Sequence, residues 1–374
     1  MSPHKTASPL TSTFPSALAH HSHSSNPASP ATTNESIYSQ TQFSSSETTS
    51  LSSIEDAPPT IRALRPGIYV PTVTFFRADN EDLDLPTIAK HAVRLARAGV
   101  AGITTQGSNG EAVHLSHQER KQVTQTTRQA LNDGGFHNVP IIVGCGAQST
   151  RETIELCNEA LTSGGDYALV LPPSYFKAML NQDSLLDFFR DVADASQVPI
   201  LIYNYPAASG GIDFTSDTIS ILAKHPNIVG CKLTCGNTGK LARIAAATAA
   251  ATPTDPGSGF MCMGGSTDFT LQTLAVGGSG IIGGMANIAP KATVKIVELW
   301  AKGNLAEAQK LQAVVARGDW AAISGGIVGT KSALQTYFGY GGFGRKPLPK
   351  PSTKEDSAFA SSFKELVDLE KTFD

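Results

Sequence analysis

Short apolar runs recur about every 30 residues from residue 67 onward, and each is followed by a segment with helical periodicity. Because these runs are apolar throughout rather than alternating, both faces of each predicted strand are expected to be buried, as in a parallel sheet. Eight strand–helix units in succession predict an α/β fold of the (β/α)8 TIM-barrel type, with an open doubly wound sheet as the alternative. The predicted strands are 67–74, 100–105, 139–143, 167–171, 199–203, 228–232, 259–263 and 280–283.

The pattern also predicts where two helices begin and that the C-terminal region is helical. Ser116 with Glu119, and Ser149 with Glu152, predict capping boxes, in which serine and glutamate satisfy each other's backbone donors. Three helical segments are predicted beyond the eighth unit, at 304–316, 324–337 and 356–371. The pattern therefore predicts a catalytic barrel at 61–303 followed by a C-terminal helical extension at 304–374.

Composition separates the first 60 residues from the rest. Residues 1–60 contain 25 Ser or Thr, seven Pro, one Lys and no Arg. Such a segment offers too few apolar side chains to offset the entropy of ordering it, so a disordered N-terminal tail is expected. The tail lacks the apolar stretch of a secretory signal, and its scarcity of Arg does not fit an ordinary mitochondrial presequence.

Charge and cysteine content exclude several classes of partner. The formal net charge is -3, and no dense Lys/Arg stripe or apolar run of 18 residues is present, so neither nucleic acid binding nor a membrane span is expected. The five cysteines are unevenly spaced, and Cys231 and Cys235 have no second pair or nearby His to complete a zinc site. We expect reduced thiols, no metal, no cofactor, and an intracellular protein, either cytoplasmic or mitochondrial.

Lys232 is the most unusual residue of the predicted strands. Lysine is rarely buried without a partner, yet Lys232 lies within the apolar run 228–232. A low-dielectric interior disfavours the ammonium form, and a neutral amine can attack a ketone to form a Schiff base. The alternative is a lysine at a strand end whose amine reaches solvent.

Two tyrosines and a serine fall at comparable positions of other units. Tyr175 follows strand four, Tyr203 ends strand five, and the steps from Tyr175 to Tyr203 and from Tyr203 to Lys232 are 28 and 29 residues. In a TIM barrel these positions lie at the catalytic, C-terminal end of the strands. Tyr203 is thus a candidate acid/base, with Tyr175 and Ser108 as a proton relay; each tyrosine could equally be a core aromatic.

The candidate residues belong to three longer motifs: Gly107-Ser108-Asn109-Gly110-Glu111, Tyr203-Asn204-Tyr205-Pro206, and Val229-Gly230-Cys231-Lys232 with Gly236-Asn237. In this order the motifs resemble the dihydrodipicolinate synthase/N-acetylneuraminate lyase superfamily of pyruvate-dependent class I aldolases. The resemblance implies a (β/α)8 barrel, usually a tetramer. It implies Lys232 as the Schiff-base lysine, Tyr203 as acid/base, and Tyr175 as a relay that often crosses a subunit interface. It further implies that Ser108 and Asn109 hold the pyruvate carboxylate and that Gly265 and Ile282 line the pyruvate pocket.

Departures from the family pattern narrow the substrate. Dihydrodipicolinate synthases carry an Arg where this chain has Ala208, so lysine biosynthesis is not expected. Ser108-Asn109 and the glycine-rich tail near Phe338 resemble eukaryotic 4-hydroxy-2-oxoglutarate aldolases, with Ser209 as a candidate for binding the distal carboxylate. The segment 231–236 is also similar to fungal aldolases that cleave 3-deoxy-hexulosonates. The preferred hypothesis is cleavage of 4-hydroxy-2-oxoglutarate to pyruvate and glyoxylate by a homo-oligomer, tetramer or dimer.

Other hypotheses stay open at this point. An inactive homologue acting as a binding or scaffold protein would keep the fold without the reaction, and an unrelated barrel enzyme is the third possibility. The segment Gly278-Ser279-Gly280-Ile281-Ile282-Gly283 matches the dinucleotide fingerprint G-x-G-x-x-G. That fingerprint should follow a strand and open a helix, whereas this segment contains the eighth predicted strand, so no dinucleotide is expected.

Overall fold

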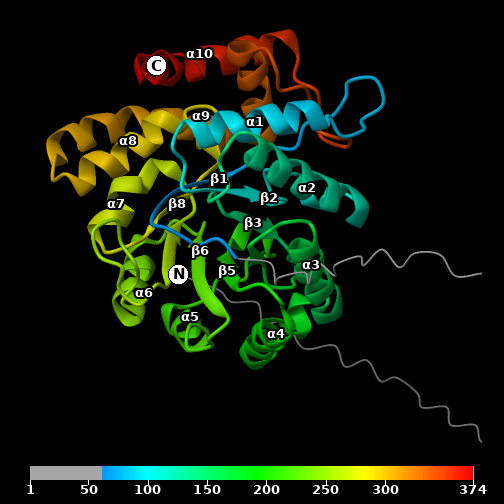
Figure 1. The fold of residues 1–374 in the computed structure, drawn as a ribbon, viewed down its shortest axis with the longest axis vertical. Coiled ribbons are helices and arrows are strands. Elements are labelled where there is room, and N and C mark those ends of the chain that lie inside the picture. Colours follow the sequence, from blue (N-terminus) through cyan, green and yellow to red (C-terminus); the bar gives the residue numbers. More distant parts are fainter. Residues whose placement is uncertain (1–60, 374) are drawn as a thin grey trace, which may run out of the picture. The chain divides into compact units, whose positions relative to one another are not determined.

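Eight parallel strands close into a barrel in chain order, and β8 pairs with β1 to complete the ring (Figure 1). The computed structural model describes residues 61–373, so the predicted tail at 1–60 lies outside the described residues. The strands are β1 (Gly67–Pro71), β2 (Gly102–Thr105), β3 (Ile141–Gly144), β4 (Tyr167–Val170), β5 (Ile200–Asn204), β6 (Ile228–Leu233), β7 (Met261–Gly264) and β8 (Gly280–Ile282). The predicted TIM barrel is confirmed, and each strand overlaps the run that predicted it.

Helices follow the strands and surround the barrel (Figure 1). They are α1 (Leu85–Arg97), α2 (His117–Asp133), α3 (Thr150–Thr162), α4 (Gln182–Ala195), α5 (Ser216–Leu222), α6 (Thr238–Thr248), α7 (Thr270–Ala275), α8 (Pro290–Ala301), α9 (Leu305–Phe338) and α10 (Thr353–Glu370). The boundary predicted at residue 304 falls between α8 and α9. Within 61–373, no helix is both long and apolar enough to cross a bilayer.

The strand side chains divide between two hydrophobic cores, as successive residues of a strand point to opposite faces. Tyr69, Leu169, Tyr203 and Met263 belong to a cluster inside the barrel, whereas neighbours such as Val70 join the core between the strands and helices. Burial on both faces explains why the sequence shows continuous apolar runs. The G-x-G-x-x-G segment contains β8, which confirms that it does not open a helix.

Two details of the helices differ from the sequence prediction. Ser116 and Glu119 form the predicted capping box of α2, but at α3 only half of it forms: the Ser149 side chain accepts from the Glu152 N–H. The Glu152 carboxylate instead lies 3.8 Å from His117 of α2, so a tertiary contact replaces the reciprocal bond.

The C-terminal extension contains two helical segments before α10, as predicted, but the break between them, within α9, lies at a different residue. The chain stays helical between residues 316 and 324, where a break was expected, because the buried face from Leu311 through Val315 to Ala322 continues across it. The interruption falls instead at Gly326, whose φ of 56° and ψ of -149° are non-helical. α9 packs against α8, α10 and the loops after β7 and β8, so it reaches the catalytic end of the barrel.

A buried histidine ties the end of α9 to the barrel. The His91 ring nitrogens lie 2.9 Å from Tyr340 Oη and 3.0 Å from Asn287 Oδ1. Asn287 in turn donates to the Pro71 and Gly284 carbonyls. Burial, with the charge of Arg94 as a second cause, lowers the pKa of His91 to about 3.

This histidine is expected to make the fold acid-sensitive. Below its ordinary pKa of 6.5 the unfolded chain takes up a proton at His91 that the folded chain excludes. The free energy of unfolding should therefore fall by about 1.4 kcal/mol per pH unit from this group as pH drops from 6.5 toward 3. Urea denaturation at pH 7, 6 and 5 measures this slope; His91→Gln should reduce it, and His137→Gln, at an exposed histidine, should not.

Candidate active site

Lys232 and Tyr203 are direct neighbours on adjacent strands. The β5–β6 register pairs Tyr203 with Lys232, and the lysine Nζ lies 3.2 Å from the tyrosine Oη and 4.3 Å from the ring centroid. Each residue is only 4% exposed. Among the described ion pairs of the barrel, none engages Lys232, so a buried amine faces a phenol without a carboxylate partner.

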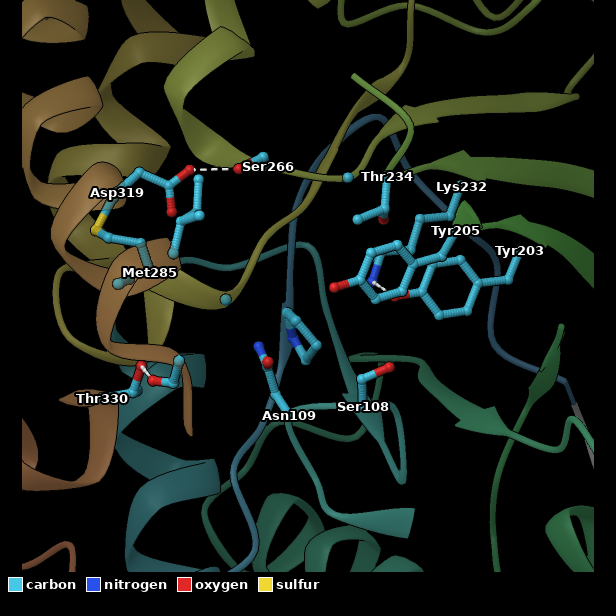
Figure 2. A pocket seen from close by; sticks show the side chains of 16 residues that line it. Ser108, Asn109, Tyr203, Tyr205, Lys232, Thr234, Ser266, Met285, Asp319 and Thr330 are labelled. Atoms are coloured by element: carbon cyan, nitrogen blue, oxygen red, sulfur yellow. Dashed lines mark hydrogen bonds between the residues drawn. The ribbon is translucent and has the colours of Figure 1, made fainter. Parts of the chain in front are cut away.

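The loop after β2 brings Ser108 and Asn109 to the same cavity (Figure 2). The loop is tightly held, because Thr74 donates to the Gly110 carbonyl and a Cβ at Gly110 would lie 3.2 Å from the Thr72 carbonyl oxygen. Asn109 packs on Gly284 after β8, where any side chain would collide with its amide. A hydroxyl and an amide thus lie opposite the Lys232 amine, in position to hold a carboxylate.

The cavity has two lobes that share Ser108 and Tyr203. The first, of about 180 Å³, contains Lys232 and extends toward α9. The second, of about 310 Å³, extends over the ends of β3 and β4 and is lined by Ala208. This is the position at which the sequence has alanine in place of the Arg of dihydrodipicolinate synthases. With alanine there, this wall of the site offers no guanidinium at that position.

Of the other predicted site residues, one lines the cavity and three do not. Gly265 lines the first lobe, and a Cβ there would collide with Thr234, so the strand ends approach closely at this point. Ile282 lies inside the barrel but lines neither lobe, and Ser209 is fully buried with an Oγ that has no hydrogen-bond partner in the described part of the chain. Tyr175 is 81% exposed and lies outside both lobes.

Sequence reasoning missed several residues of the first lobe. Thr234, Tyr205, Ser266, Asp319 and Thr330 all line it (Figure 2). Thr234 follows Lys232 by two positions, so strand alternation could have predicted that both face the same side. Asp319 and Thr330 belong to α9, and no local pattern points from that helix to the end of the barrel.

A buried ion pair supports the loop that carries Ser108 and Asn109. Lys331 of α9 lies 2.6 Å from Glu111 Oε1, and both side chains are essentially inaccessible. Lys331 also donates to the Phe343 carbonyl, while Glu111 Oε2 accepts from the Arg345 N–H. Burial lowers the pKa of Lys331, an effect that the charge of Glu111 opposes.

A second carboxylate, Asp319, faces the first lobe. Burial raises its pKa, the Ser266 hydroxyl that donates to it lowers the pKa, and the charge of Asp268 raises it again. Ser266 Oγ and the Asp268 N–H donate to Asp319 Oδ2 at 2.6 and 2.8 Å.

Potential metal ligands gather elsewhere on the barrel. His117 of α2 and Glu155 and Glu159 of α3 bring their ligand atoms within 4.8 Å of one another, but Lys121 lies 3.4 Å from Glu159. None of these three residues lines the lobe that contains Lys232. The five cysteines are free, and Cys231 Sγ lies 3.9 Å from Cys262 Sγ on the neighbouring strand.

Curated aldolases are similar to this chain over most of its length. A probable mitochondrial 4-hydroxy-2-oxoglutarate aldolase from Emericella nidulans is 57% identical over 310 residues, which cover 83% of this chain and 97% of the relative. An L-threo-3-deoxy-hexylosonate aldolase from Hypocrea jecorina is 52% identical over 316 residues, covering 84% and 99%.

Solved structures of the same kind match the fold. A dihydrodipicolinate synthase family protein from Coccidioides immitis has a TM-score of 0.73 at 35% identity and covers 83% of this chain and 98% of its own. A prophage protein from E. coli K12 in complex with pyruvate has a TM-score of 0.73 at 27% identity, covering 81% and 99%. The model of the dihydrodipicolinate synthetase family matches residues 65–366, and the chain belongs to this family.

Proposed function

We propose that this protein is a pyruvate-dependent class I aldolase that cleaves 4-hydroxy-2-oxoglutarate to pyruvate and glyoxylate. The observation that carries the proposal is the buried Lys232 amine 3.2 Å from Tyr203 Oη, in a cavity that also exposes Ser108 and Asn109. The 57% identity to a relative named for this activity supports the choice of substrate.

The residues suggest a sequence of steps. The Lys232 amine adds to the C2 ketone, water leaves, and the resulting iminium accepts the electrons of the C3–C4 bond. Tyr203 removes the proton of the C4 hydroxyl as that bond breaks, and the aldehyde departs. The enamine is then protonated at C3 and hydrolysed to pyruvate, which restores Lys232. Ser108 and Asn109 hold the C1 carboxylate, with Gly265 at the pyruvate end; Ile282 and Ser209, which were expected to contact the substrate, line neither lobe and support the site from behind it.

The test is pyruvate release, measured with both candidate substrates on one preparation. We expect kcat/KM to favour 4-hydroxy-2-oxoglutarate over a 3-deoxy-hexulosonate by at least about tenfold, since sites that bind a substrate's polar group discriminate strongly against analogues lacking it. A ratio in the opposite direction would assign the chain to the sugar-acid aldolases and leave the role of Lys232 unchanged. No pyruvate from either compound would leave an inactive homologue.

A specific observation favours the second candidate, cleavage of a 3-deoxy-hexulosonate. Relatives from Hypocrea jecorina and Aspergillus niger named for L-threo-3-deoxy-hexylosonate cleavage are 52% and 50% identical. The first lobe is lined by the hydroxyls of Thr234, Ser266 and Thr330 and by the Asp319 carboxyl. Such a wall suits a product end that carries hydroxyl groups.

Assembly and location belong to the same proposal. The Tyr175 ring packs on that of Phe176, and Phe176, Met179 and Val113 are 62%, 80% and 93% exposed. A second copy of the chain would cover exposed apolar side chains and bring Tyr175 to a neighbouring cavity. We expect a homo-oligomer, dimer or tetramer, by analytical ultracentrifugation; a monomer at assay concentration would remove Tyr175 from the relay. The location remains the predicted intracellular one, cytoplasmic or mitochondrial, and the name of the Emericella relative supports the mitochondrial alternative.

A further inference from the structure

Asp319 is a carboxylate inside the reaction cavity that the steps above do not use. It is 3% exposed, and it lies on the α9 side of the first lobe, across from Lys232 and Tyr203 (Figure 2). Its two hydrogen bonds, from Ser266 Oγ and the Asp268 N–H, both go to Oδ2. Neither bond uses Oδ1, so the carboxyl keeps an acceptor that is not committed to these groups.

The first lobe contains few side chains that can carry a charge. Among the described residues that line it, Lys232 is the only basic side chain and Asp319 the only carboxylate. Once the Schiff base forms, the Lys232 nitrogen is bonded to C2 of the substrate, so the lobe keeps no free basic side chain to pair with a distal carboxylate. Thr234 Oγ1 is buried and has no hydrogen-bond partner within 61–373, so it too is available to a ligand.

Attachment to Lys232 favours a substrate chain that extends into this lobe rather than the other one. Lys232 lines the first lobe and not the second, and a Schiff-base substrate is covalently attached to its amine. With C1 held at Ser108 and Asn109, the carbons beyond the C3–C4 bond have the Thr234 and Asp319 side of the lobe ahead of them. The groups at that end of the substrate therefore meet hydroxyls and a carboxylate.

We propose that Asp319 limits how strongly the enzyme prefers a dicarboxylate at the distal end of its substrate, so that the hydroxylated acid is accepted better than it would be without this carboxylate. Its carboxylate accepts hydrogen bonds from hydroxyl groups and repels a second carboxylate, since like charges interact strongly where water is largely excluded. The inference rests on the proposed aldolase function. It names a specificity residue, supplied by the C-terminal extension, that penalises a dicarboxylate relative to a polyhydroxy acid.

The test is Asp319→Asn, which keeps the size of the side chain and an oxygen for the Asp268 N–H. The ratio of kcat/KM for 4-hydroxy-2-oxoglutarate to that for an L-threo-3-deoxy-hexulosonate should rise at least about tenfold, mainly through KM. Asp268→Asn is the matched control, because it removes a neighbouring carboxylate that does not line the lobe. It should change the ratio by less than about threefold.

A second variant tests the same inference in case Asp319→Asn does not fold. Ile323 lines the same lobe and is 50% exposed, so Ile323→Lys adds a cation at the rim without burying it. It should move the ratio in the same direction as Asp319→Asn. Folded variants whose ratios stay within twofold of the wild-type value would overturn the assignment of Asp319.

Equilibrium binding separates this inference from the proposed function. In a Lys232→Ala background no reaction occurs, and isothermal titration with each compound reports affinity alone. Asp319→Asn in that background should tighten binding of the dicarboxylate relative to the hydroxylated acid; an unchanged relative affinity contradicts the inference. If the wild-type protein releases pyruvate from neither compound, the proposed function fails, and the titrations still decide the role of Asp319.

Discussion

Lys232→Ala is expected to lower turnover at least about a thousandfold and to abolish the covalent adduct with pyruvate. The amine belongs to the only basic side chain that lines its lobe among the described residues, and it lies 3.2 Å from the phenol that would exchange protons with it. Lys232→Arg should not restore activity, because a guanidinium stays protonated and is not nucleophilic. Borohydride reduction in the presence of pyruvate, followed by peptide mass spectrometry, locates the adduct.

A second buried lysine provides the control. Lys240 is 4% exposed, but it is paired with Asp213 and does not line the cavity, so Lys240→Met should keep the adduct on Lys232. Tyr203→Phe should still be trapped by borohydride while its kcat falls, since it retains the amine and loses the acid/base. An adduct on Lys240, or undiminished turnover in Lys232→Ala, would refute the assignment.

The second large effect is expected at the buried pair of Glu111 and Lys331. Lys331→Met leaves the Glu111 carboxylate buried without its cation, which typically costs about 3–5 kcal/mol of stability. Because Glu111 ends the loop that carries Ser108 and Asn109, KM for the oxo acid should also rise in the protein that remains folded. Urea denaturation and steady-state kinetics measure the two effects.

Two further variants identify the cause of the loss. Lys331→Met with Glu111→Gln removes both charges and should cost less than the sum of the single changes, as expected for groups that interact directly. Arg317→Met breaks the ion pair between Arg317 of α9 and Glu365 of α10, whose side chains are 59% and 55% exposed. It should change stability by no more than about 1 kcal/mol. Equal losses for the buried and exposed pairs would contradict this account.

Glu111 and Lys331 are 220 residues apart, and Ser266 and Asp319 are 53 apart, so only the packing of α9 on the barrel brings them together. Nothing in the local sequence of α9 predicts a carboxylate in the cavity, because its hydrophobic periodicity reports only which face is buried. The same limit applies to Tyr175, which strand spacing places near the site but which the fold of the chain leaves 81% exposed.

The sequence by itself determined the eight strands, the start of α2 and the pairing of Tyr203 with Lys232. These features depend on local periodicity, capping chemistry and a repeat of about 29 residues, which bring equivalent strand ends to one level. Tertiary structure alone decided that α9 runs unbroken to Gly326, that its Asp319 and Thr330 complete the cavity, and that Lys331 supports the Ser108 loop. Those outcomes depend on which surfaces pack together. Contacts between segments that are distant in the chain produce no periodicity or residue spacing that can be recognised in the sequence.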